Sequence, residues 1–578
     1  MSLEEVFNKF PAPSKRMSYG TAGFRDEWST LHSLFVRMGS LATLRSRSKK
    51  AAVGIMITAS HNAEKDNGIK MVDTDGGMLE QSWEPLAEEI VNYQNSNEVI
   101  EFLNRLSTQL NCSDTSLPSA IIIGRDTRPH SKLLFDCVCL GINAINGIIF
   151  DIGEVTTPQL HFIVQKFNQD NNHDNFQSLI NSFNPQTAVQ EYYTTLINGY
   201  LQLQRSSENL PITDIIVDGA YGVGGLSIKA LEDTLKQQQQ QQDSNQEFSL
   251  LNVEVRNKVG EGSVNFGCGA EVVQKGQVPP HNITPNDANK LICSYDGDAD
   301  RIVFHTFLSN EASSFTLLDG DKIAALISNY LQHEIQASGL FESKQFRMGV
   351  VQTAYANGGS THFLKSRGFE VAIAKTGVKY LHHLAQSYDI GVYFEANGHG
   401  TIIFSESFIH EVQSYIATDP DPTWDNETIQ QHLRKNLAFY RLKATLQLIN
   451  QAVGDAISDM LMCMISLQIL GWSLQNWIEM YTELNSRQTK VPSNNKGIIK
   501  CSEDETNVLH PSELQNDLNL HMSTIPFGRC FVRPSGTEDY IRIYAEAKTQ
   551  EDADKLALLC IQAISTHVGI TGETPQSF

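Results

Sequence analysis

The sequence has little positive charge. It holds 44 Lys and Arg residues against 66 Asp and Glu residues, which gives a formal net charge of −22 over 578 residues. Proteins dedicated to nucleic acids or to anionic membranes need a basic excess. The charge balance therefore argues against both kinds of partner, although it allows a local basic pocket for a small phosphorylated ligand.

Long apolar runs are also missing. No stretch approaches the roughly 18 consecutive apolar residues that a membrane span requires. The first residues, MSLEEVFNKFPAPSKR, contain no apolar segment of the kind found in signal peptides. The nine cysteines are scattered and form no CxxC pair. These absences predict a cytoplasmic protein with reduced thiols and no membrane partner.

Three common motifs are missing as well: GxxxxGK[ST], GxGxxG after a strand, and HExxH. What is present is an alternation of short β-branched runs (VGIMIT, AIIIG, TDIIVDG, RMGVVQT) with longer stretches such as LLFDCVCLGINAI and KIAALISNYLQHEI, whose apolar residues have helical spacing. This alternation predicts α/β domains with largely parallel sheets. The ending CFVRPSGTEDYIRIYAEA, followed by a helix over 551–567, predicts a smaller α+β domain.

Four polar segments are predicted to be linkers or loops. They are residues 168–175, 237–242, 418–427 and 485–507. The second is a run of six glutamines, which is most simply a tolerated surface insertion.

Ser60 stands where the hydrophobic strand IMIT is predicted to end, in the segment IMITASHNAEKDNGIK. Residues at strand ends of α/β sheets commonly contact ligands. A serine there can act as a nucleophile or phosphate carrier, or it can simply cap the next helix. Lys70, ten residues further on, can be a general acid/base or a phosphate contact, or a solvated side chain.

Three aspartates lie at alternate positions in DGDADR, between two apolar strands. Asp296, Asp298 and Asp300 would repel one another strongly unless a cation sits among them. Their hard oxygen ligands suit Mg²⁺ or Ca²⁺. An EF-hand is excluded because Arg301 and Phe307 occupy its glycine and glutamate positions, whereas a solvated acidic turn remains an alternative.

Two further loops carry polar groups suited to a phosphorylated sugar. In FEANGHG, Glu395, Asn397 and His399 alternate and could share a face toward sugar hydroxyls, unless the segment is merely a glycine-rich turn. In RPSGTE, a guanidinium, hydroxyl groups and exposed backbone N–H groups predict a phosphate cradle without a Walker lysine. Its residues are Arg533, Ser535, Gly536 and Thr537.

Together, TAGFR, TASHN, DGDADR, EANGHG and RPSGTE occur in one chain in this order, spanning residues 20 to 542. The set resembles the α-D-phosphohexomutase superfamily. The segments YGTAGFR, VVQTAYANG, KTGVKYLHH, DIGVYFEANGHGT, GDAISDM and FVRPSGTED are similar to its branch that acts on N-acetylglucosamine phosphates rather than to the phosphoglucomutases. The resemblance covers essentially the whole chain apart from the glutamine run.

The resemblance implies a role for each matching residue. Ser60 would be phosphorylated, and one of its phosphate oxygens would join Asp296, Asp298 and Asp300 around one Mg²⁺ per chain. The catalytic surroundings would be Arg25, His61, Lys70 and Arg301, with Lys70 as the acid/base candidate. The residues implied to bind the sugar phosphate are Glu395, Asn397, His399, Arg533, Ser535, Gly536, Thr537 and Arg542.

The resemblance also implies a reaction and a fold. The reaction is N-acetylglucosamine 6-phosphate ⇌ N-acetylglucosamine 1-phosphate, toward UDP-N-acetylglucosamine, with N-acetylglucosamine 1,6-bisphosphate or a similar compound as activator of Ser60. The fold is three related α/β domains and a smaller C-terminal α+β domain around a central cleft. The expected domain ranges are 1–187, 188–304, 305–440 and 441–578.

Two positions depart from many superfamily members: Ala63 replaces a proline, and Val378 replaces a histidine after KTG. The second departure is shared by the N-acetylglucosamine branch. It leaves open which group of the third domain assists proton transfer, with Lys379, His382 and His383 nearby. The alternatives to this function are a phosphoglucomutase, a Mg²⁺-dependent phosphatase and a non-catalytic sugar-phosphate-binding homologue.

Overall fold

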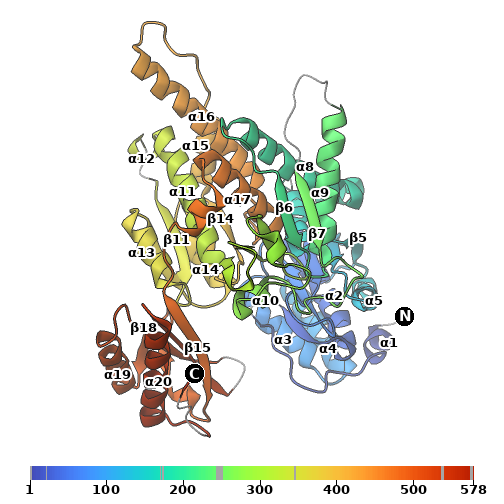
Figure 1. Cartoon of the computed structure of the whole chain (residues 1–578). Helices are drawn as coiled ribbons and strands as arrows, with labels where there is room; N and C mark the ends of the chain where they lie inside the picture. Colours follow the sequence, from blue (N-terminus) through green and yellow to red (C-terminus); the bar gives the residue numbers. More distant parts are fainter. Residues whose placement is uncertain are drawn as a thin grey trace. The chain divides into compact units, whose positions relative to one another are not determined.

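The structure is a computed structural model of the chain. It describes residues 3–20, 23–169, 171, 175–241, 251–343, 346–535, 539–572 and 577–578. By its internal contacts the chain divides into two compact units. The first comprises Met1–Asp319, Asn397–Thr401 and Ile416–Gly471, and the second comprises Gly320–Ala396, Ile402–Tyr415 and Trp472–Phe578. The colour bar of Figure 1 locates these segments.

The first unit begins with a five-stranded sheet of order β1-β3-β2-β4-β5. Strands β2, β4 and β5 are parallel, whereas β3 and β1 run antiparallel to their neighbours. The VGIMI and AIIIG runs form β2 and β4 and are buried on both faces, as in sheets covered by helices on both sides. The strands are β1 (Phe24–Glu27), β2 (Val53–Ile57), β3 (Asp66–Val72), β4 (Ala120–Arg125) and β5 (Ile148–Glu154).

Helices cover both faces of this sheet. Val53, Ile55 and Ile57 point into a core shared with α1 (Leu3–Asn8), α2 (His32–Lys49), α3 (Glu84–Asn92), α4 (Ser96–Gln109) and α5 (Ser131–Ala144). On the opposite face, Met56 and Ile122 pack against α6 (Thr157–Gln169) and α7 (Phe176–Ser182). The polar ends of the strands, where Ser60 follows β2, therefore lie beyond an apolar interior.

A second five-stranded sheet has the order β10-β9-β8-β6-β7. Strand β6 is parallel to β7 and β8, whereas β9 is antiparallel to β8 and β10. The aspartate loop joins β8 to β9, as the sequence predicts. The strands are β6 (Asp214–Asp218), β7 (Asn252–Arg256), β8 (Ile292–Tyr295), β9 (Ile302–Phe307) and β10 (Phe315–Leu318).

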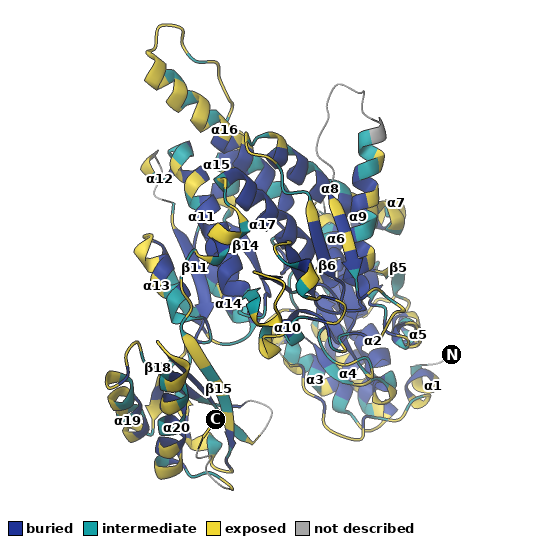
Figure 2. Ribbon diagram, viewed as in Figure 1, coloured by how far each residue is buried: buried dark blue, intermediate teal, exposed yellow. Residues whose placement is uncertain are grey.

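Five helices complete the first unit. Helix α17 is apolar on all sides and buried along almost its whole length, which is typical of a core helix (Figure 2). Helix α8 packs against both α16 and α17. The five are α8 (Pro185–Arg205), α9 (Val223–Gln241), α10 (Ala270–Gly276), α16 (Asn426–Leu448) and α17 (Ala456–Leu470).

The second unit contains a four-stranded sheet of order β12-β11-β13-β14, with β11 parallel to β12 and β13. The RMGVVQT run forms β11, and the predicted helix KIAALISNYLQHEI lies within α11, so both predictions are confirmed. The strands are β11 (Met348–Thr353), β12 (Glu370–Ala374), β13 (Ile390–Phe394) and β14 (Gly400–Phe404). The helices are α11 (Gly320–Ser338), α12 (Leu340–Ser343), α13 (Gly358–Ser366), α14 (Val378–Ala385), α15 (Glu406–Ser414) and α18 (Leu474–Ile478).

The C-terminal part is an antiparallel sheet of order β15-β19-β18, which confirms the predicted α+β ending. One face packs on α19 and α20 through apolar residues such as Val532 and Ile543. The other face carries polar and aromatic side chains. The elements are β15 (Asn485–Pro492), β16 (Lys500–Cys501), β17 (Val508–His510), α19 (Ser512–Ser523), β18 (Arg529–Pro534), β19 (Tyr540–Ala547) and α20 (Gln550–His567). Short 3₁₀ turns occur at Trp28–Thr30, Gln81–Trp83, Pro285–Asp287, Ala312–Ser314 and Lys496–Ile498.

Two of the predicted linkers are wrong. Residues 237–241 of the glutamine run belong to α9, because glutamine is a good helix former and continues the preceding helix. Residues 485–492 form strand β15, whose polar residues satisfy their backbone by pairing with β19. Segment 418–427 is irregular until α16 begins at Asn426. In segment 168–175, residues 168 and 169 end helix α6, and residues 170 and 172–174 lie outside the described residues.

In the described part of the chain, no helix combines the length and apolar character needed to span a bilayer. The four expected domain ranges stay a prediction.

Candidate active site

Ser60 lies in the turn that leads from β2 to β3. Its side chain is buried, and its φ of +49° falls in the left-handed region that residues other than glycine seldom adopt. The Oγ atom of Ser60 lies 2.9 Å from Lys70 Nζ and 3.1 Å from Asp298 Oδ2. Arg25 Nη2 lies 3.4 Å from the same oxygen. The structure thus gathers predicted catalytic and metal-binding residues around one hydroxyl.

Two side chains that the sequence analysis did not single out hold the backbone of this turn. Arg128 Nη2 donates to the carbonyl oxygens of Ser60 (3.1 Å) and Asn62 (2.7 Å). Asn265 Nδ2 donates to the same two oxygens, at 2.8 and 3.0 Å. Arg128 also pairs with the buried carboxylate of Asp126. Strained residues persist only where their surroundings fix them, and this double clamp fixes Ser60.

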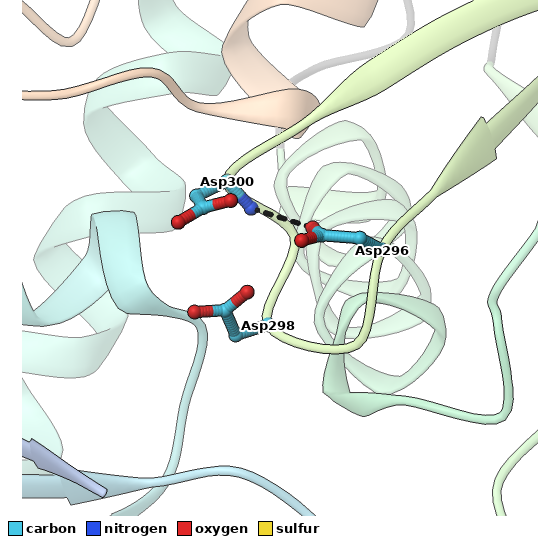
Figure 3. Close-up of side chains that lie close together, drawn as sticks. All are labelled: Asp296, Asp298 and Asp300. Atoms are coloured by element: carbon cyan, nitrogen blue, oxygen red, sulfur yellow. Dashed lines mark hydrogen bonds between the residues drawn. The ribbon is translucent and has the colours of Figure 1, made fainter. Parts of the chain in front are cut away.

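The three aspartates of the β8–β9 loop converge, as Figure 3 shows. All three are buried, and an oxygen from each lies within 4.8 Å of the others. Within the described residues, Asp296 Oδ2, Asp298 Oδ1 and Asp300 Oδ1 have no hydrogen-bond partner. Gly297 is required in this loop because a Cβ atom there would come within 2.6 Å of the Ser60 carbonyl oxygen. The aspartate loop therefore packs directly on the serine turn.

The charges of the cluster are only partly balanced. Lys70 Nζ lies 2.9 Å from Asp298 Oδ2 and 3.0 Å from Asp300 Oδ2. Burial acts to lower the pKa of Lys70, but these two carboxylates outweigh it and the pKa is raised. Burial, followed by the charges of Asp300 and Asp298, raises the pKa of Asp296 well above its ordinary value. A divalent cation would relieve this repulsion, and the unpartnered oxygens are the hard donors that Mg²⁺ prefers, so the site fits Mg²⁺.

Arg301 and His61 lie on the edge of the cluster and share a partner that the sequence analysis missed. Arg301 Nε lies 3.7 Å from Asp300 Oδ1, and Arg301 Nη1 lies 3.5 Å from Glu271 Oε2. His61 Nε2 lies 3.2 Å from the same Glu271 oxygen. Burial, Arg301 and Arg25 lower the pKa of His61, so its imidazole is neutral. Glu271 stands at the start of α10, where no sequence motif marks it.

Thr157 is another missed residue. Its Oγ1 donates to Asp298 Oδ2 at 2.5 Å, and its backbone N–H donates to the Asp298 carbonyl oxygen at 3.1 Å. Thr157 is the first residue of helix α6, so the helix begins beside the aspartate loop.

The predicted sugar loop is divided between the two units. His399 and Asn397 belong to the first unit, where His399 Nδ1 lies 3.8 Å from Asp300 Oδ1. The Oδ1 atom of Asn397 accepts a hydrogen bond from the N–H of His399 at 3.0 Å. Glu395 belongs to the second unit, where its Oε1 accepts from the Gly377 N–H at 3.2 Å. The structure places His399 beside the aspartate cluster, and Glu395 beside the KTG turn (residues 375–377).

The predicted phosphate cradle lies at the end of β18. Arg533 pairs directly with Arg542 of β19, and Arg542 pairs with Lys490 of β15. Residues paired in this way point to the same face, so three cationic side chains follow one another across the sheet. Like charges in such a row repel unless an anion lies between them. Lys490 was missed because its segment was interpreted as a linker.

Arg533 is also held by an aromatic neighbour, since its Nε donates to Tyr355 Oη at 3.1 Å. Ser535 continues the strand end, and its N–H donates to the Tyr540 carbonyl oxygen at 2.9 Å. Gly536 and Thr537 lie outside the described residues. The described part of the cradle thus presents a row of three cations, of which Arg533 is held by Tyr355, and such a row suits a phosphate.

Comparisons with known proteins agree with this fold. Family models described as phosphoglucomutase/phosphomannomutase match residues 40–98 and 95–173 (α/β/α domain I) and 526–559 (C-terminal domain). Models described as phosphoacetylglucosamine mutase AMG1 match residues 182–303 (domain II) and 319–472 (domain III). The fold is that of an α-D-phosphohexomutase.

Relatives define the family more closely. The phosphoacetylglucosamine mutases of Arabidopsis thaliana and Homo sapiens are 41% and 38% identical to this chain, over 97% of it and over 97% and 96% of their own lengths. The Aspergillus fumigatus N-acetylphosphoglucosamine mutase solved with GlcNAc-6P and magnesium has a TM-score of 0.85 and 33% identity, covering 98% of this chain and 99% of its own. The same relative was solved as a serine-to-alanine variant with glucose 1,6-bisphosphate. The chain belongs to the phosphoacetylglucosamine mutase family, which confirms the resemblance seen in its motifs.

Proposed function

We propose that this chain interconverts N-acetylglucosamine 6-phosphate and N-acetylglucosamine 1-phosphate by way of a phosphoserine at Ser60 and a bisphosphorylated sugar. The observation that carries the proposal is the surroundings of Ser60 Oγ. A buried ammonium lies 2.9 Å from this oxygen, and a cluster of three buried carboxylates with unpartnered oxygens adjoins it. A hydroxyl in this setting is suited to carry a phosphoryl group.

Asp296, Asp298 and Asp300 are the residues that would hold Mg²⁺, with a phosphate oxygen on Ser60 beside them. When bound, the ion would neutralise negative charge on the transferring phosphoryl group. The magnesium in the Aspergillus fumigatus relative supports this assignment. Arg301 and Arg25, which lie near the cluster, are proposed to orient the phosphoryl oxygens through charge-assisted hydrogen bonds.

In the first half-reaction a hydroxyl of the sugar monophosphate attacks the phosphorus on Ser60. The new P–O bond to the sugar forms, the P–O bond to Ser60 breaks, and a general base takes the hydroxyl proton. Lys70 Nζ is close enough to give a proton to the departing Ser60 Oγ. In the second half-reaction Ser60 attacks the other phosphate of the bisphosphorylated sugar, and Lys70 takes the serine proton back. The P–O bond between that phosphate and the sugar breaks, and the general base returns its proton to the departing sugar oxygen.

Each half-reaction needs a second anion site that grips the phosphate not being transferred. We assign this role to Arg533, Arg542 and Ser535, together with Gly536 and Thr537. The cation row on β18 and β19 supports the assignment, because it offers several N–H donors on one face. Glu395, Asn397 and His399 are assigned to the sugar.

The proposal extends to cofactor and location. N-acetylglucosamine 1,6-bisphosphate, or a similar sugar bisphosphate, would load Ser60 with its first phosphoryl group. We place the protein in the cytoplasm, because all nine cysteines are free thiols, most of them buried. The product would serve UDP-N-acetylglucosamine synthesis.

The test is phosphorus NMR of the purified chain with Mg²⁺, N-acetylglucosamine 6-phosphate and a trace of the sugar bisphosphate. We expect N-acetylglucosamine 1-phosphate to form, and intact-mass measurement to show one added phosphate on the wild type and none on Ser60→Ala. Release of inorganic phosphate without the 1-phosphate would indicate a phosphatase. Absence of any turnover with an intact fold would indicate a sugar-phosphate-binding homologue.

A further inference from the structure

Glu505 lies at the tip of the turn between β16 and β17, a segment that no sequence motif marks. Its φ is +61°, a left-handed conformation that is uncommon for a residue with a side chain. Backbone hydrogen bonds hold the turn: Glu505 N–H donates to the Ser502 carbonyl oxygen at 3.0 Å, and Ser502 N–H donates to that of Asn507 at 2.8 Å. A conformation of this kind persists only where the surroundings fix it. The contacts of the Glu505 side chain therefore indicate its role.

The carboxylate of Glu505 is shared between two other segments. Its Oε2 accepts hydrogen bonds from Thr376, at 3.1 Å from the backbone N–H and 2.7 Å from Oγ1. Its Oε1 lies 3.6 Å from Arg533 Nη1, and both side chains are largely buried, with exposed fractions of 12% and 13%. Glu505 is thus anchored to Thr376 and faces the guanidinium of the predicted phosphate cradle.

Thr376 belongs to the turn between β12 and α14, and this turn continues toward the sugar loop. Its neighbour Gly377 donates its N–H to Glu395 Oε1 at 3.2 Å. A chain of contacts within the second unit therefore runs from Glu395 through the KTG turn to Glu505 and Arg533. At one end is the carboxylate assigned to the sugar, and at the other is the arginine assigned to the phosphate.

We propose that Glu505 is a positioning residue that links sugar recognition to phosphate recognition. It does so by holding the Arg533 side chain in a fixed position relative to the KTG turn. The inference rests on the proposed function of Arg533. Tyr355 takes the Nε donor of Arg533, and Glu505 attracts its Nη1 from beyond hydrogen-bond distance, so the guanidinium is oriented while donors are left for a phosphate. Orienting a long side chain before binding lowers the entropy lost on binding. The Thr376 donors offset the negative charge of Glu505, which limits repulsion of a phosphate.

The test is steady-state kinetics of the full chain with N-acetylglucosamine 6-phosphate. For Glu505→Ala we expect KM to rise about tenfold, the effect of losing one charge-assisted contact, while kcat changes by less than about threefold. Glu505→Gln can still accept from Thr376 but lacks the charge, so we expect a smaller rise, of about threefold. Glu503→Gln, an exposed carboxylate of the same turn, is the matched control and should match the wild type.

A double-mutant cycle separates positioning from general stability. Thr376→Val removes one of the two anchoring donors, and the double variant Thr376→Val/Glu505→Ala should raise KM no more than Glu505→Ala alone. Additive effects of the two substitutions, or unchanged KM in Glu505→Ala, would overturn the inference. A lower KM in Glu505→Gln would also overturn it, because Glu505 would then compete with phosphate for Arg533.

Arg533→Ala distinguishes the role of the phosphate cradle from the positioning role of Glu505. If this variant keeps the wild-type KM, the assignment of the phosphate cradle fails. If it raises KM while the Glu505 variants do not, the cradle stands and the positioning role of Glu505 fails.

Discussion

Lys70 Nζ lies 2.9 Å from Ser60 Oγ, and both residues are buried. The lysine also contacts two aspartates, whose charges raise its pKa against the opposite effect of burial. The ammonium form is therefore maintained beside the serine. A proton donor at hydrogen-bond distance from the leaving oxygen is what transfer of a phosphoryl group away from serine requires.

Replacing Lys70 with methionine should lower kcat by roughly 10²–10⁴-fold, the usual range for removing a general acid/base. The apolar side chain has a similar length, so the variant tests the proton rather than packing. The exposed Lys65 of the same segment provides the control, and Lys65→Met should keep wild-type turnover. A Lys70→Met enzyme with kcat within threefold of wild type would contradict the assignment.

Asp298→Asn should weaken magnesium binding, because it removes one of three converged charges from the site. We expect the Mg²⁺ concentration for half-maximal activity to rise at least about tenfold, and Mn²⁺ binding followed by electron paramagnetic resonance to weaken in parallel. Glu311→Gln, on an exposed loop after β9, is the charge-matched control. Wild-type activity that survives EDTA would argue against any metal at the aspartates.

Arg533→Ala should raise KM for the sugar monophosphate. A hydrogen bond to a charged group contributes about 1.5–3 kcal/mol, which corresponds to roughly 10–100-fold in KM. Arg487 is the control from the same sheet, because its guanidinium pairs with Asp554 of α20 instead of belonging to the cation row. Arg487→Ala is expected to alter thermal stability at most, with KM unchanged; equal KM effects of the two variants would show that the row is not the cradle.

The chain should prefer N-acetylglucosamine phosphates over glucose phosphates. Val378 is smaller than the histidine it replaces, so we expect room for an acetamido group, and the Asn397 side chain can both donate and accept hydrogen bonds. Polar groups left unpaired when glucose binds would cost about 1–3 kcal/mol each, so kcat/KM should differ at least about tenfold. Competition between the two 6-phosphates, followed by phosphorus NMR, measures this ratio. An equal or reversed preference would favour the phosphoglucomutase alternative.

Asp321 predicts a pH effect on stability. Burial raises its pKa to about 7, although it accepts a hydrogen bond from the Asn357 N–H at 2.7 Å. The folded chain therefore binds a proton between pH ~4 and ~7 that the unfolded chain has released, so stability falls as pH rises through this window. With about 1.4 kcal/mol per pKa unit, the loss is at most about 4 kcal/mol.

The Asp321→Asn variant carries no such charge. The thermal midpoint of the variant minus that of the wild type should therefore increase from pH 5 to pH 8, as measured by scanning fluorimetry. A difference that stays constant, or that shrinks with rising pH, would show that Asp321 is ionised in the folded chain throughout this range.

The sequence could predict the elements that depend on apolar patterning. The runs that form β2, β4, β6 and β11 are β-branched and buried, so their hydrophobicity marks them whatever their partners are. Ser60 and the three aspartates were predictable for a related reason. They are polar residues placed directly where such runs end, and ligand sites form there.

The residues that were missed depend on partners far away in the chain. Asn265 clamps a turn about 200 positions earlier, and Glu271 meets His61 and Arg301 from a separate helix. Neither Asn265 nor Glu271 belongs to a sequence motif that would mark it as a site residue. Strand β15 was missed because its residues NSRQTKVP lack the alternation of a half-buried strand, and its pairing with β19 gives it order. Because this strand was not predicted, the position of Lys490 beside Arg542 was not predicted either.

The glutamine tract has a consequence for how the gene can vary. Its residues 237–241 form the final turns of α9, past the last buried leucine of that helix, Leu235. Each glutamine added or removed would change the helical rise at this end by about 1.5 Å, without shifting any residue of the apolar interior. Alleles that differ in tract length should therefore share one catalytic rate, and this position is a natural place to splice in an affinity tag.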